Sequence, residues 1–309
     1  MRAAVLQTSS VPIVSTFDMP VAGDGEEIVQ VLAAGLNPID LILAKAHIAS
    51  PTAHPIVPGR EGVGIVAGER MYFSSAGSVF GSMAEYSTAR TERLIPVPHE
   101  LSNEDAITLG IAGLTAWLSL SNAAGIKEGE HVLVLGAGGA VGGLAIQAAR
   151  LLGAGRVIAA SRSAAGVQRA LEAGADAGVV LETGVNLGEQ FQAAADGRID
   201  IVLDPIWGPH AIAALQAGSP GVRLIQIGSS SGPDVSFNPA FMRMGGKRII
   251  GFSSGSVSHA ERKTVYQRLC RHRAAGELKF DVEQVNFSEL AEAWKRQAQF
   301  PQKKLVIQI

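Results

Sequence analysis

The sequence predicts an α/β protein that combines a doubly wound parallel sheet with a smaller, barrel-like β domain. From residue 131 onward, apolar strand-like segments alternate with alanine-rich helical segments, the pattern of a parallel sheet covered on both faces. Before residue 106, short strand-like segments are separated by proline and glycine, which is typical of antiparallel sheets. The chain has 309 residues, of which 47% are hydrophobic, and this is enough for two buried cores.

The elements of each domain follow from these patterns. The parallel sheet is predicted to have strands at residues 131–135, 156–160, 178–181, 200–204, 222–228 and 248–252, and helices at 140–152, 163–173, 185–195 and 209–217. The β domain is predicted to have strands at 27–33, 62–66, 70–73 and 83–87. Beyond residue 252 we expect helices at 258–276 and 287–300 and a closing strand at 304–309 that returns to the β domain.

Charge and cysteine content exclude several functions. The chain carries 26 Lys and Arg against 28 Asp and Glu, a net charge of −2, so no basic field is available for nucleic acid or an anionic membrane. The single cysteine, Cys270, cannot form an intrachain disulfide, which fits a reducing, cytoplasmic setting. Residues 1–10 show no export signal. The uncharged stretches 106–126 and 132–149 approach the length of a membrane span, but their polar residues and glycines indicate buried segments of a soluble protein.

A glycine-rich loop is the strongest functional signal. The sequence Gly136-Ala-Gly-Gly-Ala-Val-Gly142 lies between a predicted strand and a predicted helix, where backbone N–H groups can bind the phosphates of a dinucleotide. The candidate cofactor-binding residues of this loop are Gly136, Gly138, Gly139, Ala140, Val141 and Gly142. The spacing departs from Gly-x-Gly-x-x-Gly, because Val141 follows Gly138 by three residues. The alternative is a tight turn without a ligand.

The end of the next strand predicts NADP(H) rather than NAD(H). An NAD site usually carries an acidic residue here, whereas this strand ends in Ala-Ala-Ser161-Arg162. Ser161 can donate a hydrogen bond to a 2′-phosphate and Arg162 can pair with it. The alternative is a serine that caps the next helix beside a solvated arginine.

These features, with further motifs, resemble the medium-chain dehydrogenase/reductase superfamily in its zinc-free, quinone oxidoreductase-like branch. The further motifs are Ala34-Gly-Leu-Asn-Pro-Ile-Asp40, Pro58-Gly-Arg-Glu-Gly-Val-Gly64, Gly113-Leu-Thr-Ala-Trp117, Ala173-Gly-Ala-Asp176 and Asp204. The resemblance implies a GroES-like domain of residues 1–115 and 255–309 and a Rossmann domain of residues 116–254. It also implies NADPH in a cleft and a homodimer joined through the nucleotide domains.

The ligands that hold zinc in other members of the superfamily are missing. Residues 33–40 contain no cysteine, the Gly-His-Glu position is Gly59-Arg60-Glu61, and the four cysteines of a structural zinc site are absent, so we expect no zinc. Without a Lewis acid, hydride transfer to a quinone or an α,β-unsaturated carbonyl is expected rather than alcohol oxidation. The sequence also lacks the family's Arg-x-Gly-x-Tyr pattern after Asp40, and the segment between Gly64 and Tyr72 is shortened.

Three residues are candidate catalytic groups. The resemblance places Asn37 beside the nicotinamide or the substrate carbonyl, although it could instead cap a proline turn. His47 could donate a proton, because histidine commonly serves as a general acid near neutral pH, although such histidines are more often simply exposed. Arg60 could stabilise negative charge or pair with Glu61. Asp40 is expected to cap a helix.

The resemblance also places four residues in loops around the ribose and nicotinamide, with ordinary loop packing as the alternative. These are Thr115, Gly228, Phe252 and Ser253. Asp204 is expected to cap the following helix, and Trp207 is expected to pack rather than to stack on a ligand.

The favoured function is an NADPH-dependent, zinc-free reductase of small quinones or enones. Two alternatives stay open: a non-catalytic NADPH-binding protein that responds to its cofactor by binding a partner, and an alcohol dehydrogenase.

Overall fold

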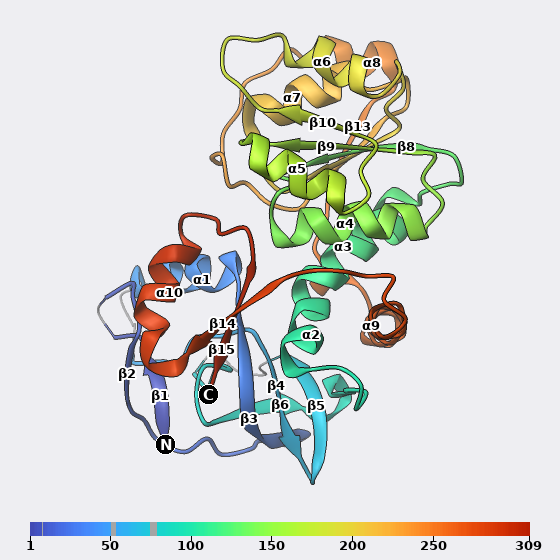
Figure 1. Ribbon diagram of the computed structural model, residues 1–309. Helices are drawn as coiled ribbons and strands as arrows, with labels where there is room; N and C mark the ends of the chain where they lie inside the picture. The colour runs from blue at the N-terminus through green and yellow to red at the C-terminus, as the bar shows by residue number, and fades with distance from the viewer. Residues whose placement is uncertain (8, 51–53, 75–78) are drawn as a thin grey trace. The chain divides into compact units, whose positions relative to one another are not determined.

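The computed structural model describes residues 1–7, 9–50, 54–74 and 79–309. The chain forms two compact units (Figure 1). The first unit comprises Met1–Ile111, Tyr266–Glu277 and Asp281–Ile309, and the second unit comprises Ala112–Val265 and Leu278–Phe280.

The borders of these units differ from the predicted division at 115/116 and 254/255. Residues 112–115 and 255–265 group with the second unit. Contacts inside the second unit account for both segments, since the Thr115 hydroxyl lies 3.2 Å from that of Ser254 and the Asn122 amide donates to Glu261 at 3.0 Å.

The second unit contains a six-stranded sheet in the order β10-β9-β8-β11-β12-β13. Every neighbouring pair is parallel. The strands are β8 (His131–Leu135), β9 (Arg156–Ser161), β10 (Ala177–Val180), β11 (Ile201–Asp204), β12 (Arg223–Gln226) and β13 (Arg248–Gly251). All six predicted strands are present, and the predicted doubly wound Rossmann sheet is confirmed.

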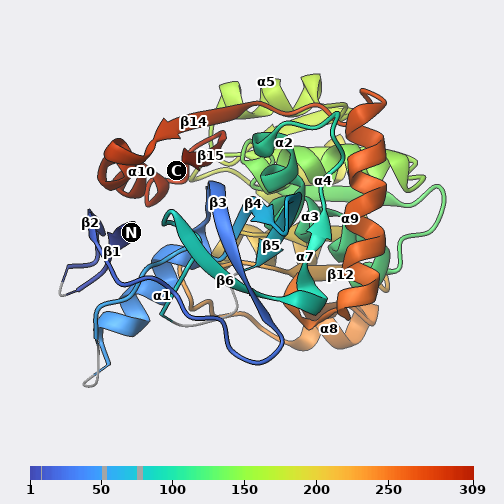
Figure 2. The same ribbon diagram turned by 90° about the horizontal axis from the view of Figure 1, so that it is seen from below.

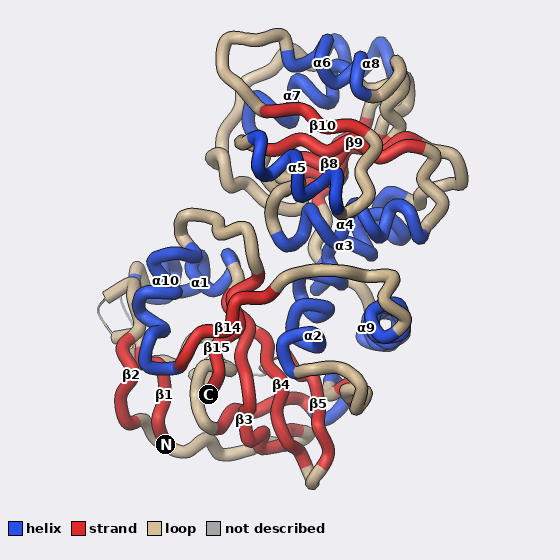
Figure 3. The backbone as a smooth tube through the Cα atoms, in the orientation of Figure 1, coloured by secondary structure: helices blue, strands red, loops and turns tan. Residues whose placement is uncertain are grey.

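Helices cover both faces of this sheet, with α6, α7 and α8 on one side and α3, α4 and α5 on the other (Figure 3). The helices and helical turns are α3 (Leu114–Leu118), η3 (Ser119–Ala124), α4 (Ala140–Leu151), α5 (Ala164–Glu172), α6 (Leu187–Ala194), α7 (Gly208–Ala217), α8 (Ala240–Gly245) and η4 (Ser254–Ser256). Helix α8 was not predicted, and none of its residues is buried, so it lacks the apolar periodicity that marks a packed helix.

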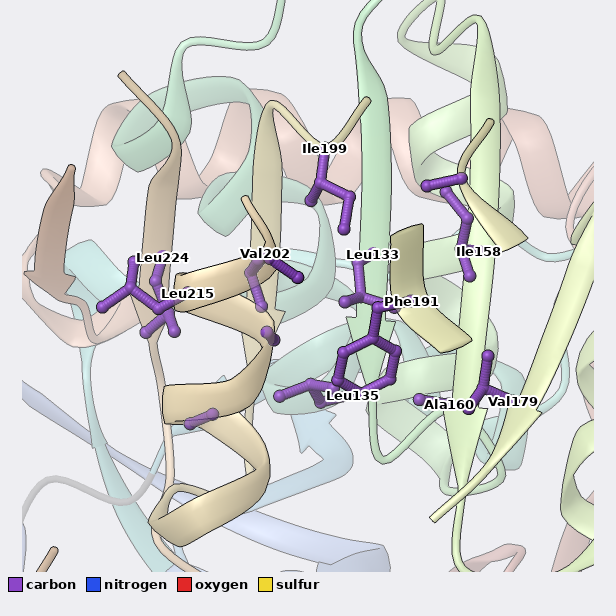
Figure 4. Close-up of a cluster of buried hydrophobic side chains, with 14 of the residues drawn as sticks. Leu133, Leu135, Ile158, Ala160, Val179, Phe191, Ile199, Val202, Leu215 and Leu224 are labelled. Carbon is purple, nitrogen blue, oxygen red and sulfur yellow. The ribbon is translucent and has the colours of Figure 1, made fainter. Parts of the chain in front are cut away.

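One face of the sheet carries a large cluster of buried hydrophobic side chains (Figure 4). Leu133, Ile158 and Val202 come from adjacent strands in matching register. They pack with Phe191 of α6 and Leu215 of α7, and all five side chains are fully buried. This packing fixes the strand ends from which the candidate site is built.

The first unit is built on a seven-stranded sheet in the order β14-β15-β3-β4-β5-β7, with β6 paired to β3, and on a separate β1-β2 pair. The strands are β1 (Arg2–Val5), β2 (Ile13–Thr16), β3 (Glu26–Leu36), β4 (Glu61–Val66), β5 (Glu69–Ser74), β6 (Tyr86–Arg90), β7 (Ile95–Pro96), β14 (Val282–Asn286) and β15 (Lys304–Gln308). Strand β15 pairs antiparallel with β3, so the closing strand returns to the β domain as predicted, and both chain ends lie in this unit (Figure 2).

The remaining helices and helical turns belong to the first unit or to the stretches of chain that pass from one unit to the other. They are α1 (Pro38–Ile48), η1 (Thr91–Arg93), α2 (Asn103–Thr108), η2 (Leu109–Gly113), α9 (His259–Ala274), η5 (Phe287–Glu289) and α10 (Leu290–Gln297). Strands β1, β2, β7 and β14 were not predicted. In β2 every residue is at least partly exposed, so the segment shows no apolar alternation. The predicted strand at 83–87 begins only at Tyr86, because Ala84 makes a single bridge to Ala3.

One helical stretch, Asn103–Ala124, is long and apolar enough to cross a membrane, with a mean hydropathy of 1.3 in its most apolar window. In the structure, 72% of that window is buried inside the protein. A core helix passes the same length and composition test, so this stretch is weak evidence for a membrane span.

Candidate functional site

The glycine loop leaves the start of helix α4 free of side chains. Gly136 directly follows β8 and has a φ of +63°, a conformation that glycine adopts without strain. Gly139 precedes α4 in an extended conformation, and no side chain caps the helix. The first N–H groups of α4, from Ala140 to Gly142, therefore have no intrahelical acceptor. They offer donors and the positive end of the helix dipole to an anion.

Close packing explains the unusual glycine spacing. A Cβ atom on Gly142 would lie 2.5 Å from the Gly136 carbonyl oxygen and 2.6 Å from Ala137 Cα, so only glycine fits there. By contrast, a Cβ on Gly143 would meet nothing within 4 Å. Gly136 and Gly142 thus hold α4 against the turn. This is the role that glycines have in a dinucleotide loop, although the spacing differs from the usual motif.

The ends of β8, β11 and β12 meet beside this loop. A Cβ on Gly136 would lie 2.9 Å from Cγ of Pro205, and one on Gly228 would lie 2.7 Å from the Pro205 carbonyl oxygen. Ligands of open α/β sheets bind at such carboxyl ends of strands. The loop and Gly228, which were predicted separately, are therefore brought together around Pro205.

Asp204 holds the turn after β11. Its Oδ1 accepts hydrogen bonds from the backbone N–H groups of Ile206 at 2.9 Å and Trp207 at 2.7 Å. Burial raises the pKa of Asp204 to about 6. The carboxylate was expected to cap helix α7; it instead fixes the residues that lead into that helix.

Ser161 and Arg162 end β9 but differ in accessibility. Ser161 is 6% exposed, and a Cβ on Gly166 would overlap its hydroxyl oxygen, so this hydroxyl lies under the first turn of α5. Arg162 is exposed. The residue that caps α5 is Ser163, whose hydroxyl accepts from the Gly166 N–H at 3.1 Å. Arg162 is therefore the accessible member of the predicted pair.

The remaining cofactor candidates also lie in the second unit. Phe252 follows β13 and donates its N–H to the Gln226 carbonyl at 2.9 Å. Ser253 is exposed, and its hydroxyl accepts from Gly255 at 3.3 Å. The Thr115 hydroxyl is paired with that of Ser254, which connects it to the same loop.

Asn37, in the first unit, is buried among protein partners. The residue is 4% exposed. Its Oδ1 accepts from the Lys304 ammonium at 2.5 Å, and its Nδ2 donates to Glu61 Oε1 at 2.9 Å. Both ends of the amide thus have partners within the first unit, and the place of Asn37 beside the nicotinamide or the substrate carbonyl stays a prediction.

Glu61 is the centre of this arrangement. It is fully buried, and its Oε1 also accepts from Lys304 at 2.7 Å. Its Oε2 accepts from the Tyr72 hydroxyl at 2.9 Å and from the Ile111 backbone N–H at 2.7 Å. We call Asn37, Glu61, Tyr72 and Lys304 the Glu61 network. Sequence reasoning missed Lys304 and Tyr72; the one available signal was a lysine at the start of an otherwise apolar strand.

Asp40 caps helix α1 beside the Glu61 network. Its Oδ2 accepts from the Asn37 N–H at 2.8 Å, while Oδ1 has no hydrogen-bond partner in the part of the chain that the structure describes. Burial raises the pKa of Asp40 to about 7, against the opposing effects of this hydrogen bond and of the Lys304 charge. Its structural role agrees with the sequence-based expectation.

His47 and Arg60 lie at different places in the first unit. His47 lies in the last turn of α1, where its Nε2 is 2.7 Å from the His54 carbonyl oxygen. Ten residues separate it from Asn37, which is roughly 15 Å along a helix. Arg60 is exposed just before β4. His47 therefore lies away from Asn37, whereas Arg60 directly precedes Glu61, to which the Asn37 amide donates. Among residues 1–7, 9–50, 54–74 and 79–309, no three His, Cys, Asp or Glu side chains gather as metal ligands.

Comparisons with known proteins agree with the α/β fold described above. The family model "Zinc-binding dehydrogenase" matches residues 140–270. The quinone oxidoreductase of Sus scrofa is 30% identical over 269 residues, which cover 84% of this chain and 79% of the relative. The solved quinone oxidoreductase of Thermus thermophilus, also studied as a complex with NADPH, is 26% identical with a TM-score of 0.81, over the full length of both chains. A solved NAD-dependent alcohol dehydrogenase is likewise 26% identical, with a TM-score of 0.85 and full coverage of both chains.

Proposed function

Because the chain belongs to the quinone oxidoreductase-like branch of the medium-chain dehydrogenase/reductase superfamily, we propose that it reduces a small quinone or α,β-unsaturated carbonyl with NADPH, without zinc. The observation that carries this proposal is the glycine loop, where Gly136 and Gly142 leave room for no side chain and the first turn of α4 presents N–H groups that lack an intrahelical acceptor. A dinucleotide pyrophosphate fits this surface by charge and by shape.

The choice of NADPH rests on Arg162. This guanidinium is exposed at the end of β9, the strand next to β8, and a planar guanidinium matches the geometry of a phosphate. The end of β9 carries no carboxylate that would favour the ribose hydroxyls of NAD. The Ser161 hydroxyl contributes less, because it is buried under α5.

The chain's own residues are assigned binding and positioning roles. When bound, the cofactor supplies the hydride. The glycine loop would hold the pyrophosphate, Arg162 the 2′-phosphate, and the loops at Gly228 and Phe252 the nicotinamide half. We propose that solvent supplies the proton, since the Asn37 amide can donate a hydrogen bond but is not an acid. The absence of zinc is supported by Arg60 at the position where zinc-dependent relatives carry histidine.

A non-catalytic NADPH-binding protein is the second candidate. The observation that favours it is the separation of His47 from Asn37, roughly 15 Å along helix α1, which keeps the candidate proton donor apart from the candidate carbonyl-binding residue. It predicts cofactor binding without turnover, so the same experiment separates the two candidates.

The test is oxidation of NADPH, followed by its absorbance, with a panel of ortho- and para-quinones and 2-alkenals. We expect turnover with at least one compound, and a KM for NADPH at least about tenfold below that for NADH, because a phosphate contact worth about 1.4 kcal/mol changes affinity tenfold. Arg162→Ala should raise the KM for NADPH and leave that for NADH unchanged. Arg169→Ala, which removes another exposed arginine of the second unit, is the matched control. NADPH binding without oxidation of any compound would support the second candidate instead.

A further inference from the structure

Trp207 has a backbone conformation that a tryptophan rarely adopts. Its φ is 60° and its ψ is −165°, a region that is populated almost only by glycine. The Asp204 carboxylate fixes this conformation by accepting the Trp207 N–H at 2.7 Å. Strain of this kind persists only where the surroundings impose it, and it concentrates at ligand sites.

The side chain of Trp207 borders two hollows in the surface of the second unit. One, of about 360 Å³, is lined by Trp207, Gln226, Ser229, Pro233, Ile249 and Gly251. The other, of about 470 Å³, is lined by Trp207 and by residues 233–236. Trp207 packs only partly against the core of this unit, so part of its surface faces these hollows.

The segment that leads to Trp207 lies beside the glycine loop. A Cβ on Gly136 would lie 2.9 Å from Pro205 Cγ and 3.2 Å from Ile206 Cγ2, and these are the two residues directly before Trp207. Gln226 and Gly251 end strands β12 and β13. A dinucleotide whose pyrophosphate lies on α4 and whose adenosine lies near Arg162 has its other half on this side of the sheet.

The chemistry of the lining suits an uncharged or cationic ring rather than a phosphate. Neither hollow is lined by a lysine or an arginine, and Asp234 adds a carboxylate. Trp207 and Ile249 supply apolar surface, while Gln226 and Ser229 supply hydrogen-bonding groups. Aromatic faces attract flat rings and cations.

We propose that Trp207 is a cofactor-binding residue whose ring packs against the nicotinamide–ribose half of the dinucleotide. The inference rests on the proposed function, and it adds a residue that the sequence assigned to ordinary packing. A glycine would adopt this backbone conformation without strain. A tryptophan at this turn places an aromatic residue in the lining of both hollows.

The first experiment compares ligand affinities of variants by calorimetry. Trp207→Ala should weaken NADPH binding at least about tenfold, whereas Trp207→Phe, which keeps an aromatic ring, should stay within about threefold, because stacking rather than the indole N–H carries the contact. Adenosine 2′,5′-bisphosphate, which lacks the nicotinamide half, should bind all three proteins equally.

A thermal unfolding measurement tests the backbone strain. Trp207→Gly should melt at or above the temperature of Trp207→Ala, because glycine adopts a φ of 60° without strain.

The second experiment uses the unmodified protein, so it does not depend on a variant that folds. Trp117 and Trp294 are only 2% and 3% exposed, and acrylamide therefore quenches mainly Trp207. Saturating NADP⁺ should at least halve this quenching, while the bisphosphate should leave it unchanged.

Three results would overturn the inference. Equal NADPH affinity in Trp207→Ala and the unmodified protein would show that Trp207 does not contact the bound dinucleotide. Equal loss of NADPH and bisphosphate affinity would assign Trp207 a purely structural role. If the unmodified protein bound neither ligand, the proposed function itself would be wrong, and this result is distinct from the first two.

Discussion

At the scale of single residues, the buried pair of Lys304 and Glu61 connects the two ends of the first unit. Lys304 begins the closing strand β15 and is 4% exposed, and Glu61 begins β4 and is fully buried. Charges this deep are tolerated only when their donors and acceptors are satisfied. Lys304 donates to Glu61 and Asn37 and lies 3.3 Å from the Leu36 carbonyl oxygen, which meets that condition.

Removing one partner of this pair should destabilise the protein. Lys304→Met should lower the free energy of unfolding by about 3–5 kcal/mol, because it leaves the Glu61 carboxylate buried without its cation. Lys295→Met is the matched control, since Lys295 forms a 2.8 Å ion pair with Glu292 in which both side chains are more than half exposed; it should cost less than about 1 kcal/mol. Urea denaturation measures both. Equal losses in the two variants would contradict the role assigned to Lys304.

Asn37 also shows what a sequence motif leaves undetermined. Asn37 stands in the motif that carries the family resemblance, yet its amide serves the Glu61 network. A motif gives the residue type and its place in the chain. Which neighbour the side chain meets depends on Lys304, 267 residues away, and no local pattern contains that information.

At the scale of elements, the turn from β8 into α4 is set by two glycines. Gly136 supplies the positive φ, and Gly142 lets the first turn of α4 touch the backbone of Gly136 and Ala137. The strand, the loop and the helix were all predictable here, because the apolar strand, the glycines and the alanine-rich helix are local signals.

Two neighbouring glycines of α4 test this explanation. Gly142→Ala should destabilise the protein by about 1–3 kcal/mol through overpacking and weaken NADPH binding at least about tenfold, because α4 must move away from the turn. Gly143→Ala, whose new Cβ meets nothing within 4 Å, should stabilise the helix by about 0.5–1 kcal/mol and leave NADPH binding unchanged. Thermal unfolding and calorimetry measure the two effects. The explanation fails if Gly142→Ala binds NADPH as tightly as Gly143→Ala.

At the scale of the whole molecule, the second unit has a poorly covered edge. From Gln226 to Ser256 no residue is buried, although this segment contains Phe237, Phe241 and Met244. It includes the edge strand β13. The N–H groups of Arg248 and Phe252 point to β12, so by alternation those of Ile249 and Gly251 point to the open edge. An apolar segment beside an open edge favours pairing with another strand.

We therefore predict a homodimer that pairs through β13. Light scattering after size exclusion should give about twice the chain mass of 32.1 kDa. Gly251→Pro removes an N–H from the open edge without removing one from the β12 ladder, so it should shift the protein toward the monomer. Gly255→Pro, placed beyond the strand, is the control. A monomer in the unmodified protein, or a Gly251→Pro variant that stays fully dimeric, would contradict pairing through this edge.

Local sequence patterns were enough to predict the class of both domains, the parallel sheet, the glycine loop and the family. These depend on the order of apolar, glycine and helix-forming residues along short stretches of chain. Tertiary structure alone decided that Asn37 is buried, that Ser161 lies under α5 and Arg162 does not, and that the strained Trp207 stands next to the dinucleotide loop. Each of these depends on contacts between elements distant in sequence, where burial and charge pairing, rather than local propensity, fix the position of a side chain.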